Sequence, residues 1–427
     1  MVSKYRNVIL LMLFLAMVIN YIDRAALAIA MPFITTDFHL SPTEKGLIFS
    51  SFSVGYAAFN FIGGYFADRF GAKKVFFWSM GAWSIMCGMT ALVSSFSSLL
   101  IVRVLFGAGE GPISTTANKT VNNWFPVEER ARAVGANQAG GPLGGALAGP
   151  VIGLMALSFG WRSAFVFMAV VGILWVIVWR KVATETPAIH PRVSAAELQL
   201  ISGTPEHASV ITEPSEPPRL LAVISNPGVL FTGISLFCYN YILFFFMSWF
   251  PSYLIDARGV SLQNMSVVTS LPWLIGACGY TFGGVLIDYL FKVTGKQLLS
   301  RKIVLVSALL IASSCIGLTG ITTSATGAVV VMTVAIGFLM LAAPSYWSLI
   351  QDVVPKNQVG TAGGFMHGLA NLSGIVGPAI TGMLIERTGT YTTGFVLAGA
   401  LGVAGALIVL FFVRQTDPQP AVRQRPI

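Results

Sequence analysis

Two residues of opposite charge, Asp23 and Arg24, stand near the middle of an apolar run from Val8 to Phe33. The run is long enough to cross a bilayer as a helix. A charge at that depth costs several kcal/mol unless it is paired or faces water, so such residues usually line a pathway. A carboxyl group there can exchange a proton, and a guanidinium group can hold an anion through two parallel hydrogen bonds.

A second charged pair, Arg103 and Glu110, has similar apolar surroundings. On a helix these two residues share one stripe, roughly 10 Å apart along the axis. The other acids fall at predicted span ends or in loops, which leaves Asp23 and Glu110 as the carboxyls deep in the spans. Both could bind and release a proton as their surroundings change, because burial and a nearby arginine act on them in opposite directions.

The two arginines are expected to act as fixed positive charges, since arginine keeps its proton in proteins. We assign Arg24 to the carboxylate of an anionic ligand, because Arg24 can bind in a bidentate way and lies beside Tyr21 on the helix. We assign Arg103 to electrostatic partnership with Asp23 or Glu110. The alternative is a static buried network that holds helices together. Buried ion pairs are poor stabilisers, which favours the functional interpretation.

The elements that must position these charges are predicted to be membrane helices. Hydrophobic residues make up 55% of the 427 residues, charged residues make up 10%, and the mean hydropathy is +0.76. Soluble domains contain about a quarter charged residues, so the sequence predicts an integral membrane protein. We expect twelve spans, at residues 8–33, 44–66, 75–94, 98–121, 131–154, 161–181, 226–254, 262–291, 300–321, 325–350, 357–385 and 391–414.

The formal net charge of +9 does not indicate nucleic-acid binding, because the basic residues are distributed by side of the membrane. With the N-terminus inside, most lysines and arginines fall in cytoplasmic segments. The opposite side holds only Lys45, Arg162, Arg258 and Arg387. This distribution predicts that both termini are cytoplasmic. We expect a multi-pass protein of a bacterial inner membrane.

The four cysteines are expected to behave as small buried hydrophobic residues. They occur singly within predicted spans, so neither a disulfide framework nor a metal motif is indicated. They are Cys87, Cys238, Cys278 and Cys315.

The chain repeats itself around a polar segment at about 182–222. Asn20-Tyr21-Ile22 recurs as Asn240-Tyr241-Ile242, Gly63-Gly64 recurs as Gly283-Gly284, and Gly149-Pro150 recurs as Gly377-Pro378. All three offsets lie close together, which indicates an internal duplication. We therefore predict an N-terminal six-helix bundle (1–181), a cytoplasmic linker (182–222) and a C-terminal six-helix bundle (223–427). The two pseudo-symmetric bundles would surround a central cavity.

The stretch from Gly64 through Asp68, Arg69 and Gly71 to Lys74 resembles the signature loop between spans 2 and 3 of the major facilitator superfamily. The resemblance implies an all-α fold of about twelve transmembrane helices. It also implies that Gly64, Asp68, Arg69 and Gly71 form a gate motif. A glycine permits close helix approach there, and Asp68 can cap or pair basic groups.

Within that superfamily, the first half is similar to the anion:cation symporters that import sugar acids. The matching residues are Asn20 to Arg24, Arg103 with Glu110 and Pro112, and Trp124-Phe125-Pro126 with Glu129-Arg130. The resemblance implies that Asp23 and Glu110, with Arg103, couple transport to protons, and that Arg24 and Tyr21 bind substrate. It implies no cofactor besides the proton, a small organic anion as substrate, and a carrier that functions as a monomer.

Further substrate contacts are expected from polar and aromatic residues on other spans. The second half has Leu243-Phe244 where the first has Asp23-Arg24, so ion coupling is expected in the first half. Amides would read hydroxyl groups while aromatic rings pack on the sugar. The candidates are Tyr56, Asn60, Asn240, Tyr241, Trp347, Ser348, His367 and Asn371.

Two other functions are compatible with an apolar, glycine-rich chain of this kind. Gly141-Pro142-Leu143-Gly144-Gly145 partly resembles the glycine-proline signature of antiporters, which would export a drug, sugar or organic acid. Its spacing is short by one residue, and Arg24 favours an anion over a cationic drug. A membrane enzyme is not indicated, because the sequence has no metal cluster, nucleophile elbow or phosphate loop. The sequence therefore favours proton-coupled import of a sugar acid such as an aldonate, hexuronate or aldarate.

Overall fold

The structure is a computed structural model that describes residues 5–202, 223, 225–354 and 358–414. Within these residues every regular element is a helix. Eleven helices are long and apolar enough to cross a membrane, and a bent pair, Pro42–Asn60 with Ile62–Phe70, supplies a twelfth crossing. The predicted all-α membrane fold is confirmed.

Six of these crossings precede the linker. They are formed by α1 (Arg6–Phe38), α2 (Pro42–Phe70), α3 (Ala72–Met89), α4 (Phe96–Glu110) with α5 (Ile113–Trp124), α6 (Val127–Gln138) with α7 (Gly140–Phe159), and α8 (Trp161–Val182). A short helix, α9 (Ala195–Ser202), follows where the sequence predicted one.

The remaining crossings follow the linker. They are formed by α11 (Pro227–Asp256), α12 (Leu262–Val268) with α13 (Ser270–Thr294), α14 (Gln297–Ile321), α15 (Ala325–Val353), α16 (Val359–Thr388) and α17 (Thr392–Phe412). We refer to α1–α8 as the first half and to α11–α17 as the second half.

The span expected at 98–121 is interrupted at Gly111 and Pro112, between α4 and α5. Proline has no N–H to donate and its ring crowds the preceding turn, so a helix breaks or bends there. The break makes Glu110 the last residue of α4. The break therefore determines where this buried carboxylate meets α1.

Repeated glycines mark close helix crossings in both halves. In the first half, Gly63 lies against Pro112 where α2 crosses the α4–α5 break. In the second half, Gly283 lies against the carbonyl of Leu341 where α13 crosses α15. A side chain at either glycine would overlap its neighbour, which gives this repeated glycine pair a packing role. The domain limits 1–181, 182–222 and 223–427 stay predictions, and much of the linker lies outside the described residues.

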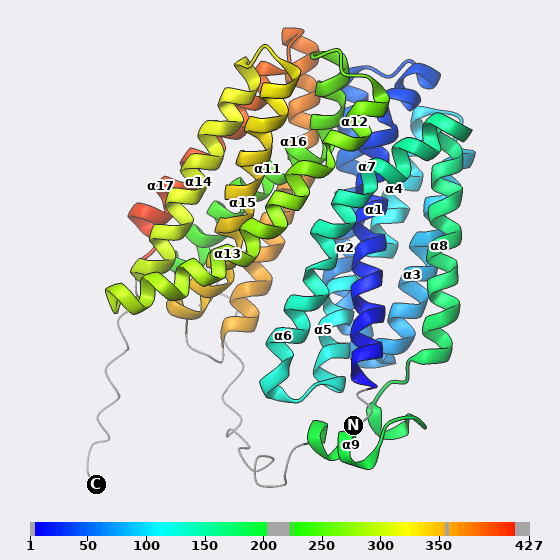
Figure 1. Cartoon of the computed structure of the whole chain (residues 1–427), viewed down its shortest axis with the longest axis vertical. Helices are drawn as coiled ribbons and strands as arrows, with labels where there is room; N and C mark the ends of the chain where they lie inside the picture. Colours follow the sequence, from blue (N-terminus) through cyan, green and yellow to red (C-terminus); the bar gives the residue numbers. More distant parts are fainter. Residues whose placement is uncertain (1–4, 203–222, 224, 355–357, 415–427) are drawn as a thin grey trace.

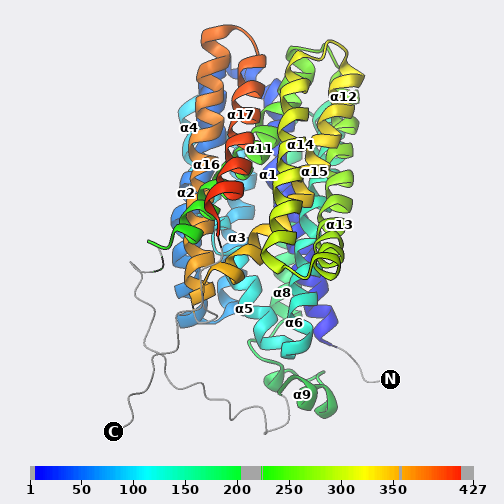
Figure 2. The same ribbon diagram turned by 90° about the vertical axis from the view of Figure 1, so that its left-hand side faces the viewer.

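The two halves lie side by side and diverge toward one end of the molecule (Figure 1). We call this the linker end, because α1 begins there and α9 lies there; the opposite end is the far end (Figures 1 and 2). The halves meet toward the far end, where the Oγ of Ser50 accepts a hydrogen bond from the amide of Ala379 at 3.1 Å. An ion pair between Lys45 and Asp256, at 3.6 Å, also joins them.

The segment after α8 docks on the start of α1. The carboxylate of Glu197 on α9 accepts hydrogen bonds from the backbone amides of Tyr5, at 3.0 Å, and Arg6, at 3.1 Å. The ring of His190 lies 4.0 Å from the ring of Tyr5. The Nε2 of His190 donates to the carbonyl of Val182, and its Nδ1 accepts from the amide of Arg192. Burial lowers the pKa of His190 below its ordinary value.

Candidate functional site

A buried ion pair between Arg24 and Glu110 forms the centre of the site. The Nε of Arg24 lies 2.6 Å from Oε1 of Glu110, and the amide of Asn20 donates to the same oxygen. The side chain of Glu110 is fully buried, whereas that of Arg24 is 14% exposed. Arg24, which the sequence assigned to a substrate, is therefore held by a carboxylate of the protein in this conformation.

Asp23 is buried beside the ion pair and contacts α3. Its Oδ1 lies 3.6 Å from Sγ of Cys87, and both residues are almost fully buried. From the sequence, Cys87 is expected to behave only as a small hydrophobic residue, so this contact is an addition to the predicted site. Nothing in the sequence spacing pairs residues 23 and 87, because their contact depends on how α3 packs against α1. Cys278, by contrast, is exposed on its helix.

Arg103 stands close to both acids without a direct ion pair among the described residues. Its guanidinium lies over the rings of Phe106, at 4.7 Å, and Phe52, at 5.1 Å. Its Nε is buried and has no hydrogen-bond partner in the described part of the chain. Arg103 still interacts electrostatically with Glu110 and Asp23, the partners that the sequence suggested.

Three aromatic rings surround the guanidinium of Arg24. The distances from its central carbon to the ring centres are 4.5 Å for Tyr56, 5.2 Å for Phe52 and 5.6 Å for Tyr21. Such rings attract a cation and leave its N–H edge free for an anion. Tyr21 and Tyr56, both predicted substrate contacts, thus lie next to the predicted anion-binding group.

A cavity of about 490 Å³ lies between the two halves, and Tyr21 forms part of its wall. Neither Asp23 nor Glu110 lines this cavity. Gly135 and Gly284 also line the cavity, and a Cβ on either glycine would meet no atom within 4 Å, so neither position is closely packed. The lining side chains that the sequence analysis did not select include Gln138, Trp273, Tyr280 and Thr281.

Two of the predicted substrate residues bond to their own half. The amide of Asn60 donates to the carbonyl of Gly111 at 3.2 Å. The ring of Tyr241 is 1% exposed, and its hydroxyl lies 3.2 Å from the hydroxyl of Thr381. In this conformation Tyr241 packs inside the second half and does not line the cavity, because helix α16 covers it.

The other candidates of the second half lie on α11, α15 and α16. His367 is close enough to Arg24 to interact with it electrostatically. Its ring lies 5.8 Å from that of Trp347, which is 45% exposed. Asn371 is buried, and its amide donates to a backbone carbonyl of α16. Ser348 is half-buried, and its hydroxyl donates to a backbone carbonyl of α15. Asn240 is half-buried. The substrate roles of these residues stay predictions.

The predicted gate motif forms contacts within the first half. Asp68 is paired with Lys119 of α5 at 2.6 Å, and Arg69 donates to the hydroxyl of Tyr65 at 2.8 Å. Gly71 has φ of +89°, a conformation that glycine adopts without strain, and it ends α2 where α3 begins. Gly64 faces Thr115 at ordinary contact distance. The gating role of these residues stays a prediction.

The twelve-crossing helical fold, the cavity between two halves and the buried charges beside it define a membrane transporter. The family model "Major Facilitator Superfamily" matches residues 13–378 and 297–426. The chain belongs to the major facilitator superfamily, as the resemblance of its signature loop implied, and it is a transporter and not an enzyme.

Two curated relatives cover nearly the whole chain. A hexuronate transporter of Bacillus subtilis is 47% identical over 423 residues, which cover 99% of this chain and 98% of the relative. A probable sulfoacetate transporter of Cupriavidus necator is 36% identical, covering 96% and 94%. Among solved structures, a D-xylose-proton symporter has a TM-score of 0.76 at 18% identity, covering 96% of this chain and 98% of the symporter. That structural likeness supports the fold.

Proposed function

We propose that this protein imports a sugar acid of the hexuronate type together with protons, by alternating access of the cavity to the two sides of a bacterial inner membrane. The observation that carries the proposal is the buried pair of Arg24 and Glu110 at 2.6 Å, next to a cavity that Tyr21 lines. The near-complete match to a hexuronate transporter supports the choice of substrate class.

In the proposed mechanism, Glu110 and the substrate carboxylate compete for the same arginine. When Glu110 is ionised it occupies Arg24, as in the structure. A proton on Glu110 removes the charge that holds the guanidinium, and Arg24 can then bind the carboxylate of the substrate in a bidentate way. Substrate binding and proton binding therefore favour each other, which is what symport requires.

Asp23 is proposed as the second proton site. It is buried beside the pair and does not line the cavity. Arg103 supplies a fixed positive charge near both acids, so the two arginines balance the two carboxylates when both acids are ionised. This arrangement confines proton coupling to the first half.

The linker end is proposed to face the cytoplasm. The basic residues that the positive-inside rule counts lie mostly at this end, including Lys73, Lys74 and Arg180. The contacts at the far end, among them Lys45 with Asp256, would then close the outer side, and the end toward which the two halves diverge would face the cytoplasm. The structure would correspond to the state that releases substrate.

Uptake into proteoliposomes tests the proposal. Purified full-length protein is reconstituted, a pH gradient (acidic outside) is imposed, and accumulation of labelled D-glucuronate is followed, with D-glucose as the control solute that lacks a carboxylate. We expect glucuronate to accumulate above its outside concentration only while the gradient lasts. Accumulation that is unchanged when an ionophore removes the gradient would contradict proton coupling. Equal uptake of glucose would contradict the anion site.

A further inference from the structure

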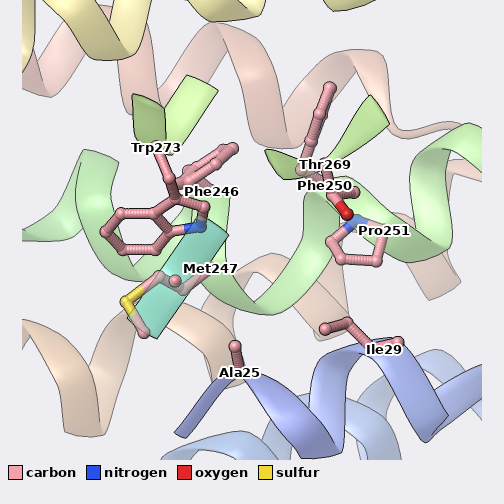
Figure 3. A pocket seen from close by; sticks show the side chains of 9 residues that line it. Ala25, Ile29, Phe246, Met247, Phe250, Pro251, Thr269 and Trp273 are labelled. Atoms are coloured by element: carbon pink, nitrogen blue, oxygen red, sulfur yellow. The ribbon is translucent and has the colours of Figure 1, made fainter. Parts of the chain in front are cut away.

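The indole of Trp273 lies between two cavities along the path through the protein. On the linker side is the large cavity of about 490 Å³. On the far side is a small void of about 20 Å³, whose walls come from α1, α7, α11, α12–α13 and the ring of Trp273 itself (Figure 3). Among the residues that line these two spaces, Trp273 is the one they share.

Trp273 crosses from the second half to the first and rests on a glycine. It lies in the first turn of α13, it is 5% exposed, and its six-membered ring lies over Gly145 of α7. A methyl group at position 145 would overlap the indole. One turn earlier on α7, Gly141 offers the same flat surface to the ring of Tyr21. Gly141 and Gly145 belong to the segment that partly resembles an antiporter signature. Each of these glycines packs against one aromatic ring.

The two seated rings touch each other. Tyr21 and Trp273 meet edge to face, with centroids 5.9 Å apart and planes at 88°. The ring of Phe246 also packs against the indole, with centroids 5.5 Å apart. Because the guanidinium of Arg24 also lies over Tyr21, a continuous set of contacts joins the anion-binding group to the ring that separates the two cavities.

We propose that Trp273 is the barrier residue that seals the substrate cavity from the far side in this conformation, seated on Gly145 and braced by Tyr21. For a substrate to pass between the ends, the indole must leave Gly145, which requires α7 and α13 to separate. The end wall of the cavity is then an aromatic surface against which the non-carboxylate end of a sugar acid packs. The role of this barrier in transport rests on the proposed function, but the closure of the cavity by Trp273 does not depend on proton coupling.

Accessibility of the small void tests the barrier directly. Ile29 lines that void and is 3% exposed, so the substitution Ile29→Cys places a thiol behind the indole. The full-length variant in proteoliposomes is exposed to a small charged methanethiosulfonate reagent, and labelling of position 29 is quantified by mass spectrometry. Adding Trp273→Ala should raise the labelling rate at least about tenfold. That factor corresponds to lowering the free energy of opening the barrier by roughly 1.4 kcal/mol.

Two further variants separate a lost barrier from general loosening. Gly145→Ala removes no packing but displaces the indole, so it should also raise labelling. Phe250→Leu enlarges the small void without touching the large cavity and should leave the rate within about twofold, as expected for a change that opens no new path. Trp273→Phe, which keeps an aromatic ring, should restore most of the protection.

The proposal is overturned if Trp273→Ala and Gly145→Ala leave the labelling rate at the level of Ile29→Cys alone, or if Phe250→Leu raises it as much as they do. Labelling is measured without substrate and without a pH gradient. A failure of proton coupling would therefore leave the labelling rates unchanged. A failure of the barrier would in turn leave coupled uptake of glucuronate by the parent chain unchanged.

Discussion

The first helices of the two halves, α1 and α11, carry the same three-residue motif in different surroundings. Tyr21 of the first copy lines the cavity beside Arg24, whereas Tyr241 of the second is buried against α16. Each tyrosine packs on a glycine of the partner helix, Gly141 on α7 and Gly377 on α16. The comparison teaches that the two halves share a packing scheme, whereas the charged pair that follows the motif in α1, Asp23 and Arg24, is absent from α11.

The largest effect is expected from Asp23→Asn, which removes a proton site without changing the size of the side chain. Gradient-driven accumulation of glucuronate should disappear, because in the proposed cycle protons load both Asp23 and Glu110 and neither site suffices alone. With a gradient of one pH unit, each coupled proton supports about a tenfold accumulation. Exchange of labelled for unlabelled substrate, which needs no net proton movement, should persist. The matched control is Glu128→Gln on the exposed surface of α6, which should accumulate like the parent. Full accumulation by Asp23→Asn would show that the first half does not carry coupling at this residue.

The next effect is expected from Arg24→Lys, which keeps the charge but loses the planar fork that binds a carboxylate at two points. A charge-assisted hydrogen bond contributes about 1.5–3 kcal/mol, so the KM for glucuronate should rise roughly tenfold to a hundredfold. Initial uptake rates over a range of substrate concentrations measure this change. Arg258→Lys, at the far end beside Tyr253, is the control and should keep the parental KM. An unchanged KM in Arg24→Lys would place the anion site elsewhere.

A smaller effect is expected from Cys87→Ala, because the thiol is the hydrogen-bond donor that reaches Asp23. Losing a donor disfavours the charged carboxylate, so the proton is held up to higher pH. The outside pH that gives half-maximal uptake should move upward by up to about one unit, since a hydrogen bond contributes about 0.5–1.5 kcal/mol. Cys87→Ser keeps a donor and should move it little. Identical profiles for the parent chain and Cys87→Ala would mean that the contact with Asp23 has no influence on proton binding.

The smallest effect concerns the linker, which docks on the first half through His190. Burial lowers the pKa of His190, so the docked state favours the neutral ring. Its contribution to docking is complete above the ordinary pKa of about 6.5 and is lost as the pH falls toward the lowered value. After correction for the intrinsic pH dependence of amide exchange, the protection of residues 187–202 should therefore be lower at pH 5.5 than at pH 7.5, in the parent but not in His190→Gln. Equal protection of the parent at both pH values would rule out this dependence.

Much of the fold follows from the sequence because a bilayer leaves a chain few choices. Apolar runs such as Val8 to Phe33 must form helices that satisfy their own hydrogen bonds, and repeated glycines mark where two such helices cross. The breaks at Gly111 and at Thr269 were not predicted. A proline or glycine permits a break, but whether a helix bends there depends on its neighbours.

The site was only partly predictable from the sequence. Asp23, Arg24 and Glu110 were found because charge is rare in apolar spans. Cys87 and Trp273 were missed, since a cysteine or tryptophan in a membrane helix is ordinary until its neighbour is known. The pairing of Arg24 with Glu110 was also missed. These residues are far apart in the chain, and helix periodicity does not show which faces of α1 and α4 meet.

The most direct test of the shared arginine is the pH dependence of glucuronate binding to Glu110→Gln, measured by calorimetry beside the parent chain. In the parent, the ionised carboxylate of Glu110 claims Arg24, so binding should weaken steadily as the pH rises. In Glu110→Gln, Arg24 has no such competitor, and the affinity should stay nearly constant over the same range. A variant that keeps the parental pH dependence would contradict the competition between Glu110 and the substrate for Arg24.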